Sequence, residues 1–482
     1  MKMNKNYNVL KKTVERCKQK EIIIPTFKQL KNPNLIPTKI KNKLKKIGLW
    51  DVNPLNLFRI TWHNNPKTGL FGDVNYLELP HELTGVKARI IALIGKYFPT
   101  GAHKVGAAFG CLVPRLVRGE FDPTTKKAVW PSTGNYCRGG AFDSALLGCP
   151  SIAILPEGMS RERFEWLKSI GSEIIATPGT ESNVKEIYDK CWELRKTRND
   201  IVIFNQFEEF GNSMWHYHIT GSAIEEVFNK IKNKKLRMSA FVSSTGSAGT
   251  IAAGDYLKKI NPSLKITACE ALQCPTLYLN GFGEHRIEGI GDKHVPWIHN
   301  VRNTDLIVAI DDQACMDIIR LFNEDKGKEY LIKQGIKEDI VKKLDLIGIS
   351  GVSNIVGAIK TAKYFEFNEN DIVFTVLTDS MELYQSRIKE MRELYGKYTT
   401  QQAAIHFNLH LIGQKIDFVK ELGYYDKKAI HNLKYFTWVE QQGKSSDELK
   451  KLWYPEFWDE IYMQVDEWDK DIEEFNKMVG II

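Results

Sequence analysis

The residues best suited to chemistry in this sequence begin with Lys104, which follows a Pro/Gly turn at residues 98–103. The next residues are rich in glycine and alanine and predict a helix from Ala102 to about Val113, which Pro114 should end or kink. Because small side chains let other backbone pack closely against this helix, we expect Lys104 to be buried. A buried ammonium group has to be neutralised, paired with an anion or used covalently.

Three later segments supply groups that could work with this lysine. Ser132-Thr133-Gly134-Asn135 offers hydroxyls, backbone N–H groups and an amide, although the same composition is common in ordinary turns. Gly246-Ser247-Ala248-Gly249-Thr250 follows an apolar strand pattern and opens a helix, where unpaired N–H groups favour an anion such as phosphate. Thr378-Asp379-Ser380 adds a late hydroxyl. In this order, the four segments carry the groups that a phosphorylated aldehyde cofactor requires.

A nucleotide is the alternative ligand for the segment 246–250. Glu270 lies about 20 residues further on, where an acid that binds ribose would be found. However, the segment does not match G-x-G-x-x-G, and no Gly-Lys-Ser/Thr follows it. The sequence therefore favours a phosphate site over a dinucleotide site and excludes a P-loop.

Alternating strand and helix patterns surround these segments. We predict strands at 58–62, 90–97, 128–130, 151–156, 173–176, 201–204, 239–243, 264–269, 306–309 and 372–377, and a loop at 77–83. Helical patterns separate most of the strands from residue 128 onward, which predicts parallel βαβ units. The expected architecture is two α/β segments with a cleft between them. The four chemical segments follow strands, where ligands bind in such sheets.

Composition and charge narrow the class of protein. The 482 residues are 43% hydrophobic and 26% charged, as in ordinary globular proteins, and no apolar run approaches the roughly 18–20 residues of a membrane span. The net charge of +8 comes from residues 1–46, which carry fourteen Lys or Arg and two Glu. The remainder is slightly acidic, so we expect neither nucleic acid nor a membrane as a partner.

The cysteines and the first residues bear on the compartment. None of the eight cysteines forms a C-x-x-C pair or a Cys/His cluster at zinc spacing, so we expect reduced thiols and no metal site. The N-terminus lacks the regions of a secretory signal. These features predict a cytoplasmic enzyme.

The two ends of the chain differ from the middle. Residues 1–50 read as a basic helix followed by a loop, either a solvated arm or an extension that wraps a second subunit. Residues 396–482 show helical spacing and hold four tryptophans, Trp438, Trp453, Trp458 and Trp468. We predict a helical appendage whose tryptophans pack on the body of the protein or on a second subunit.

Taken together, the four chemical segments resemble those of the fold type II pyridoxal-phosphate enzymes, specifically the cysteine synthase/cystathionine β-synthase family. Further segments between roughly residues 75 and 395 are similar to that family, namely Asn205-Gln206-Phe207, His216-Tyr217, Ile287–Gly291 with Val295-Pro296, Gly348–Gly351 and Asp379-Ser380. The His103-Lys104 pair instead resembles the tryptophan synthase β-subunit, whose glutamate-bearing loop is replaced here by Ser132–Asn135.

The resemblance implies an α/β fold of the tryptophan synthase β-like type, with two α/β domains that each contain a twisted, mainly parallel sheet. A large cofactor-binding domain would comprise residues 51–106 and 215–395, and a small domain with the substrate loop would comprise residues 107–214. The basic extension 1–50 and the helical extension 396–482 would flank them. A homodimer that acts on a small amino acid is also implied.

The same resemblance assigns the site residues. Lys104 would be the catalytic residue and would form the internal aldimine with pyridoxal 5′-phosphate. The other cofactor-binding residues would be Asn135, Gly246, Ser247, Ala248, Gly249, Thr250 and Ser380. The substrate carboxylate would be bound by Ser132, Thr133, Gly134 and Gln206. Ser380 would face the pyridine nitrogen, with Asp379 as the alternative.

A hydroxyl opposite the pyridine nitrogen does not enforce its protonation, so the ring withdraws electrons weakly and favours loss of a β-substituent over transamination. The expected reaction is therefore β-replacement or β-elimination on a β-substituted L-alanine, through an aminoacrylate, as in cysteine synthase. The alternatives are a pyridoxal-phosphate-dependent dehydratase or ammonia-lyase, a cysteine desulfhydrase and a non-catalytic assembly subunit. Arg138 is a candidate for binding a phosphate or acidic group of the substrate.

Overall fold

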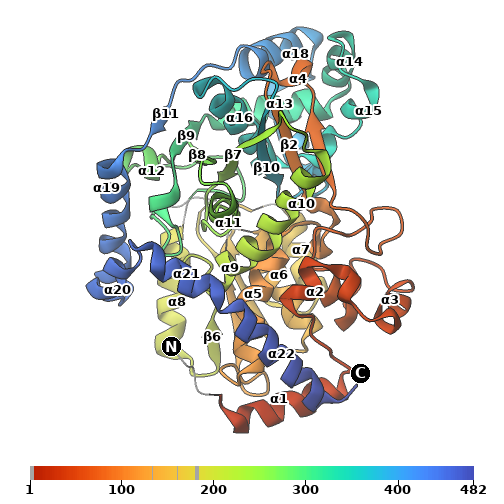
Figure 1. Ribbon diagram of the computed structural model, residues 1–482, viewed down its shortest axis with the longest axis vertical. Helices are drawn as coiled ribbons and strands as arrows, with labels where there is room; N and C mark the ends of the chain where they lie inside the picture. The colour runs from red at the N-terminus through yellow and green to blue at the C-terminus, as the bar shows by residue number, and fades with distance from the viewer. Residues whose placement is uncertain (1–4, 133, 160, 180–183, 292, 482) are drawn as a thin grey trace.

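The larger of two β-sheets contains seven strands in the spatial order β1-β2-β10-β7-β8-β9-β11. The computed structural model describes residues 5–132, 134–159, 161–179, 184–291 and 293–481 (Figure 1). The strands are β1 (Tyr76–Leu79), β2 (Arg89–Ile94), β7 (Arg237–Ser244), β8 (Lys265–Ala271), β9 (Leu306–Ile310), β10 (Asp371–Leu377) and β11 (Val419–Glu421). The five inner strands are parallel, and β1 and β11 pair antiparallel at the edges. Strands β9 and β10 are buried along their whole length, as in parallel sheets covered on both faces.

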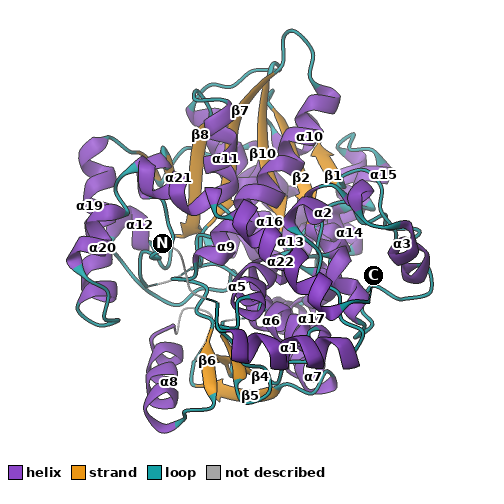
Figure 2. Ribbon diagram, turned by 60° about the horizontal axis from the view of Figure 1, so that its bottom comes forward, coloured by secondary structure: helices purple, strands orange, loops and turns teal. Residues whose placement is uncertain are grey.

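The smaller sheet is wholly parallel, with the order β5-β4-β3-β6. Its strands and helices alternate along the chain as β3 (Lys127–Pro131), α6 (Asn135–Leu146), β4 (Ser151–Pro156), α7 (Arg161–Ser169), β5 (Glu173–Thr177), α8 (Val184–Thr197) and β6 (Ile201–Ile203). Figure 2 shows this sheet at one end of the molecule, apart from the larger one. The α/β fold and the alternation expected from hydrophobic periodicity are confirmed.

Helices cover the larger sheet and lie between the two sheets. They are α4 (His81–Thr84), α5 (Lys104–Val117), α9 (Phe210–Trp215), α10 (Gly221–Ile231), α11 (Ala252–Ile260), α12 (Thr276–Leu279), α13 (Asp312–Asn323), α14 (Asp325–Lys333), α15 (Glu338–Val341), α16 (Ile349–Tyr364) and α17 (Gln385–Tyr395). Helix α16 packs on β7 and β10, and α5 packs on α6 and α9. Helix α5 therefore connects the structure around the larger sheet to that around the smaller one.

The predictions of a strand at 58–62 and of a loop at 77–83 are wrong. Residues 54–59 form the 3-10 helix η2 (Pro54–Arg59) where a strand at 58–62 was expected. The buried Arg59 guanidinium donates to the carbonyls of Leu44 and Ile47 at 2.8 and 2.7 Å, which holds this helix against the preceding segment. The loop expected at 77–83 is instead strand β1 followed by α4, because β1 pairs with β2.

Helix α5 continues past Pro114 to Val117, so the proline does not end it. A proline at position 114 removes the donor that would bind the carbonyl of Gly110. That carbonyl lies against α9, so closely that a Cβ atom on Gly211 would overlap it. The two glycines therefore allow α5 and α9 to pack backbone against backbone at this point.

The N-terminal segment lies along the C-terminal helix of the same chain. The segment contains α1 (Tyr7–Gln19), α2 (Phe27–Lys31) and α3 (Thr38–Leu44), and Figure 1 shows α1 and α2 beside α22 (Val465–Val479). Asp469 accepts hydrogen bonds from the backbone N–H groups of Phe27 and Lys28 at 2.6 and 3.1 Å. Lys5 lies 2.7 Å from Asp471. The basic segment is thus held by carboxylates of α22 and is not a free arm.

The C-terminal extension is mainly helical, as predicted, although its strand β11 completes the larger sheet, and its tryptophans are buried. It contains α18 (Thr400–Phe407), α19 (Tyr424–Lys434), α20 (Ser446–Lys451), α21 (Pro455–Met463) and α22. Trp438, in the π-helical turn η10 (Tyr435–Val439), donates through Nε1 to the carbonyl of Val295 at 2.9 Å. Lys434 donates to the carbonyls of Trp297 and His299 at 3.0 and 2.7 Å. The extension therefore covers the segment 295–299, and the prediction that its tryptophans pack on the body is confirmed for Trp438.

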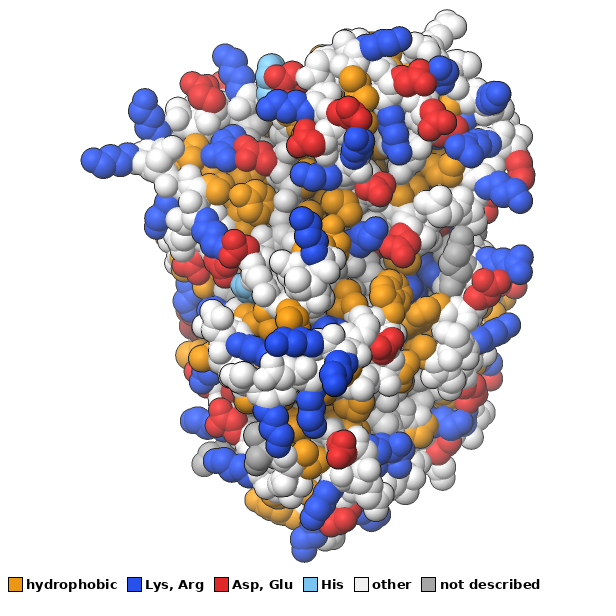
Figure 3. Space-filling model, turned by 90° about the vertical axis from the view of Figure 1, so that its right-hand side faces the viewer, with side chains coloured by type: hydrophobic (Ala, Val, Ile, Leu, Met, Phe, Trp, Pro, Cys, Tyr) orange, Lys and Arg blue, Asp and Glu red, His pale blue; other side chains and the backbone are white. Residues whose placement is uncertain are grey.

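On the face drawn in Figure 3, Lys and Arg side chains lie among Asp and Glu side chains. No helix within the described part of the chain combines the length and the apolar character needed to cross a membrane.

Candidate active site

Lys104 is the first residue of α5, and the turn before it is held at the end of β10. The backbone at Thr100 and Gly101 is left-handed, with φ of 69° at both residues, which reverses the chain before the helix. The N–H of His103 then donates to the carbonyl of Thr378 at 3.2 Å. This contact places the lysine beside the carboxyl end of the larger sheet.

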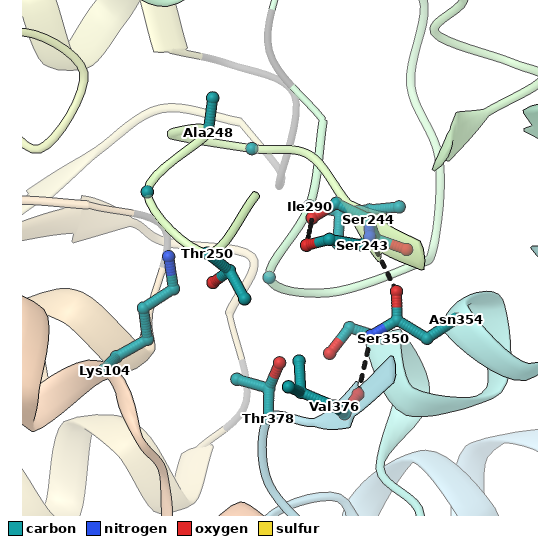
Figure 4. A pocket seen from close by; sticks show the side chains of 13 residues that line it. Lys104, Ser243, Ser244, Ala248, Thr250, Ile290, Ser350, Asn354, Val376 and Thr378 are labelled. Atoms are coloured by element: carbon teal, nitrogen blue, oxygen red, sulfur yellow. Dashed lines mark hydrogen bonds between the residues drawn. The ribbon is translucent and has the colours of Figure 1, made fainter. Parts of the chain in front are cut away.

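The side chain of Lys104 enters a pocket between β7, β10 and α16 (Figure 4). Its Nζ donates to Ser247 Oγ at 3.2 Å. The other lining residues are Ser243, Ser244, Gly246, Ala248, Gly249, Thr250, Gly289, Ile290, Ser350, Asn354, Val376 and Thr378. Lys104 is the one charged residue in this lining, within the residues that the structure describes. The pocket offers one amine, several hydroxyls and exposed backbone.

The turn between β7 and α11 has the properties of a phosphate site. The backbone N–H groups of Gly246, Ser247 and Ala248 donate to no other described residue. Ala248 has a left-handed φ of 61°, and a Cβ atom on Gly249 would overlap the side chain of Asn212. Asn212 in turn donates to Ser247 Oγ and to the carbonyl of Gln206, both at 3.0 Å. Free amides on a fixed turn before a helix are what a phosphate group requires.

Asn135 opens α6 and points toward Asp379. Its Nδ2 donates to Asp379 Oδ2 at 2.5 Å, and its Oδ1 has no hydrogen-bond partner within the described chain. Tyr384 also donates to Asp379, at 2.6 Å. Burial raises the pKa of Asp379, although both hydrogen bonds favour its charged form. The free Oδ1 leaves Asn135 able to bind a further group.

The structure gives two of the predicted substrate residues a clear position. Ser132 Oγ accepts a hydrogen bond from the N–H of Gly134 at 3.1 Å. Gln206 is buried after the end of β6. Its backbone carbonyl accepts a hydrogen bond from Asn212, which also donates to Ser247 in the turn between β7 and α11. Thr133 lies outside the described residues. Helix α6 packs against the start of α5, where a Cβ atom on Gly139 would lie 3.0 Å from the carbonyl of Lys104.

Ser380 is buried, but it is not in the lining of the pocket with Lys104. The hydroxyls that do line it on that side are Ser350, at the start of α16, and Thr378, at the end of β10. Figure 4 shows both on the side of α16 and β10, with Lys104 pointing toward the glycine turn. The sequence analysis assigned no role to Ser350. The signal that could have found it is a small polar residue between two glycines, Gly348 and Gly351, at the start of a helix.

An ion pair lies beside this pocket. Arg163 on α7 is 3.0 Å from Glu288, and both side chains are almost fully buried. Arg387 on α17 also donates to Glu288, at 2.6 Å. Glu288 directly precedes Gly289 of the pocket lining, so these contacts join a helix of the smaller sheet to the pocket wall.

Comparison with known proteins shows to which family this chain belongs. The family model described as "Pyridoxal-phosphate dependent enzyme" matches residues 76–328. Cysteine synthase of Staphylococcus aureus is 31% identical over 320 residues, which cover 66% of this chain and 94% of that protein.

Among solved structures, the fold resembles O-acetylserine sulfhydrylase isoform 3 of Entamoeba histolytica, with a TM-score of 0.56, 26% identity and coverage of 70% of this chain and 93% of the other. It also resembles a hydrogen sulfide-producing enzyme of Fusobacterium nucleatum, with a TM-score of 0.55, 26% identity and coverage of 72% and 95%.

The chain belongs to the pyridoxal-phosphate dependent enzyme family. It is an enzyme, and its cofactor is pyridoxal 5′-phosphate. The geometry fits this group: the amides of the β7–α11 turn suit its phosphate, and Lys104 lies 3.2 Å from a serine of that turn. When bound, the cofactor supplies an electron-withdrawing ring to an attached amino acid.

The pH dependence of cofactor attachment follows from the pKa of Lys104. Burial lowers the pKa of Lys104 to about 8, against a small opposing effect of Cys111. Only the neutral amine attacks an aldehyde. Below pH 8 the rate of cofactor attachment to the apoprotein should therefore rise about tenfold per pH unit, and it should level off above that value. Stopped-flow absorbance at constant ionic strength measures this rate, and a rise that continues unbroken to pH 10 would contradict the lowered pKa of Lys104.

Proposed function

We propose that this enzyme catalyses β-replacement or β-elimination on a β-substituted L-alanine. The observation that carries the proposal is the pocket lining: hydroxyls of Ser350 and Thr378 lie on the side away from the glycine turn, and the lining contains no carboxylate in the described residues. A hydroxyl next to a pyridine nitrogen leaves the ring a weak electron sink, which favours loss of a β-substituent over transamination. The likeness to a cysteine synthase supports the same class of reaction.

Several residues of this chain have proposed roles. Lys104 binds the cofactor and, in its neutral form, takes the proton from Cα of the substrate and later returns it. Asn135 would contact the ring oxygen of the cofactor through its side-chain amide. The cofactor phosphate lies on residues 246–250, and the substrate carboxylate lies on residues 132–134 with Gln206.

The residue opposite the pyridine nitrogen was predicted to be Ser380, and this remains a prediction. Ser350 is the alternative that the pocket lining favours. Replacing each serine by alanine separates the two, because only the serine that contacts the ring should change the absorption spectrum of the bound cofactor. If neither substitution changes the spectrum, Thr378 is the next hydroxyl to test, because it lines the same side of the pocket as Ser350.

Elimination without replacement is the second candidate, and it is supported by the likeness to a hydrogen sulfide-producing enzyme. The two outcomes share the steps up to loss of the β-substituent. They differ in whether a thiol or water then completes the reaction, so the products, a new β-substituted alanine or pyruvate with ammonia, distinguish them.

The test uses the purified enzyme with its cofactor. O-acetyl-L-serine, L-serine and L-cysteine are added in turn, and the visible absorption of the cofactor is followed before and after addition of sulfide. We expect at least one of them to change the spectrum, and sulfide or water to restore it. A cofactor spectrum that no β-substituted alanine alters would exclude the proposal and favour a non-catalytic subunit.

Two further parts of the proposal concern the assembly and the compartment. A homodimer is proposed from the family resemblance, and light scattering should give twice the chain mass.

A cytoplasmic location is proposed because all eight cysteines are free and buried, which suits a reducing compartment. Fractionation of cells that express the tagged protein tests the location.

A further inference from the structure

Buried polar contacts join the smaller sheet and its helices to the structure around the larger sheet. Residues 127–203, which form the smaller sheet with α6, α7 and α8, are called the small unit below. Arg163 of α7 lies 3.0 Å from Glu288, which belongs to the segment between β8 and β9 of the larger sheet. Arg387 of α17 donates to the same carboxylate at 2.6 Å and to the carbonyl of Gly158, in the small unit, at 3.0 Å. One carboxylate thus binds two arginines, one from each side of the boundary.

A second contact crosses the boundary and is linked to the first. Asp379, after β10, accepts hydrogen bonds from Asn135 of the small unit at 2.5 Å and from Tyr384 at 2.6 Å. The hydroxyl of Tyr384 also accepts a hydrogen bond from Arg163 at 3.1 Å, so the two contacts form one network. Four of its side chains are no more than 4% exposed, namely Arg163, Glu288, Asp379 and Tyr384. The network is therefore shielded from water.

A buried network of charges favours one arrangement of the parts that it joins. While the small unit stays in place, each charge has a partner, and hydrogen bonds in a region of low dielectric constant reinforce one another. If one partner is removed, the other charge is left buried and unpaired, which is strongly unfavourable. Moving the small unit away would let water hydrate that charge. The network therefore holds the closed arrangement only while its charges balance.

The network is tied to the wall of the candidate active site. Glu288 directly precedes two residues of the pocket lining, Gly289 and Ile290. The N–H of Gly291 then donates to the carbonyl of Thr245 at 3.0 Å, so this segment lies against the chain that leads into the glycine turn. The position of the small unit is thus coupled to the pocket wall through one carboxylate.

We propose that Arg163, Glu288 and Tyr384 are positioning residues, which hold the small unit closed on the larger sheet before any substrate arrives. The proposed carboxylate site at residues 132–134 belongs to the small unit, whereas the glycine turn belongs to the larger sheet. A substrate that contacts both needs the closed arrangement, so its apparent affinity falls with the fraction of enzyme that is closed. This effect on affinity rests on the proposed function, whereas the closed arrangement does not.

Glu288→Gln tests the network, with hydrogen exchange of the enzyme with bound cofactor as the readout. It leaves Arg163 buried without a carboxylate and close to Arg138, whose pKa is lowered to about 10 by burial and by the charge of Arg163. Opening relieves this repulsion, so backbone amides of the small unit should exchange at least about tenfold faster than in the parent. Amides of α14 and α18, at the other end of the molecule (Figure 1), should not change. Equal acceleration in both places would mean general loosening and would overturn the proposal.

A charge-balanced double variant separates the network from simple packing. Arg163→Met combined with Glu288→Gln removes both charges, while Arg387 keeps Glu390 at 2.8 Å. No buried charge is then left that opening would hydrate. Exchange in the small unit should return to within about threefold of the parent, although more contacts have been removed. A double variant that exchanges as fast as Glu288→Gln would overturn the proposal.

The matched control is Arg286→Met. Arg286 lies in the same segment as Glu288, but its carboxylate, Asp312 at 3.0 Å, is on α13, so this ion pair does not reach the small unit. The control should leave exchange in the small unit unchanged. Acceleration equal to that of Glu288→Gln would show that any lost ion pair of this segment has the same effect, and would overturn the proposal.

Tyr384→Phe takes the place of Glu288→Gln if that variant does not fold. The substitution keeps the ring and removes only the hydroxyl between Asp379 and Arg163. Because both ion pairs of Glu288 remain, exchange in the small unit should accelerate by only about threefold. An exchange rate equal to that of the parent would overturn the proposal.

Affinity and turnover separate the inference from the proposed function. L-alanine has no β-substituent to lose, and its dissociation constant, followed by the absorption of the cofactor, should rise about tenfold in Glu288→Gln and recover in the double variant. The kcat for the preferred substrate should fall by less than about threefold, because the enzyme with bound substrate is closed in either case. Faster exchange in Glu288→Gln, with no β-substituted alanine consumed by the parent, would support the network and refute the proposed reaction. Turnover by the parent, with exchange that the substitution does not change, would overturn the inference and leave the proposed function intact.

Discussion

Replacing Lys104 by alanine is expected to abolish turnover and to leave the cofactor unattached to the protein. Lys104 is the one amine in the pocket lining within the described residues, and its Nζ lies 3.2 Å from the glycine turn proposed for the phosphate. Loss of a nucleophile that also acts as the base should lower kcat by at least about 1,000-fold. Borohydride treatment followed by mass spectrometry measures attachment of the cofactor, and the assay with the preferred substrate measures kcat.

Lys96→Ala is the matched control for this experiment. Lys96 precedes the same turn, but its amine pairs with Glu382 at 3.3 Å and both side chains are partly exposed. The control should keep cofactor attachment and activity close to those of the parent. A Lys104→Ala protein that borohydride still links to the cofactor would refute the assignment of the lysine.

Replacing Trp438 by alanine is expected to lower the free energy of unfolding by about 3–5 kcal/mol. Trp438 is fully buried, and its indole N–H is bonded to the carbonyl of Val295 at 2.9 Å. The substitution leaves a cavity between the C-terminal extension and the segment that follows Gly289 and Ile290 of the pocket lining. Faster loss of the cofactor should therefore accompany the loss of stability. The midpoint of urea unfolding and the rate of cofactor release measure the two effects.

Phe436→Ala, in the same π-helical turn, is the control because Phe436 is 58% exposed. Its effect on unfolding should stay within about 0.5 kcal/mol. If both variants unfold at the same urea concentration, the extension does not stabilise the body through Trp438, and the contact with Val295 has no energetic consequence.

Much of the fold could be predicted because its signals are local. Strands β3, β4 and β5 are short apolar runs separated by helical patterns, and this alternation is recognisable without knowing which strands are neighbours. Strand β1 was missed because its residues qualify as a strand only through pairing with β2. The last turn of α5, after Pro114, was missed because a proline inside a helical pattern usually ends the helix.

The residues of the candidate site also divide into those that the sequence could identify and those that needed the structure. The lysine and the glycine turn could be found because each is a short segment with the right composition next to a strand. The side chain opposite the pyridine nitrogen could not be chosen from the sequence, which pointed to Ser380 or Asp379 and gave no role to Ser350. The packing of α16 on β7 and β10 brings Ser350, and not Ser380, into the lining of the pocket.

The sequence by itself determined the class of this protein: an α/β enzyme whose lysine and glycine turn suit pyridoxal 5′-phosphate. The tertiary structure alone decided that Arg138 is buried against Trp50 and Trp166, because the two tryptophans reach it from separate parts of the chain. It also decided that the two terminal extensions bind each other and that the C-terminal one covers the segment that begins at Val295. Composition and periodicity report what a residue can do and which element it joins, whereas burial and charge pairing depend on contacts between distant segments.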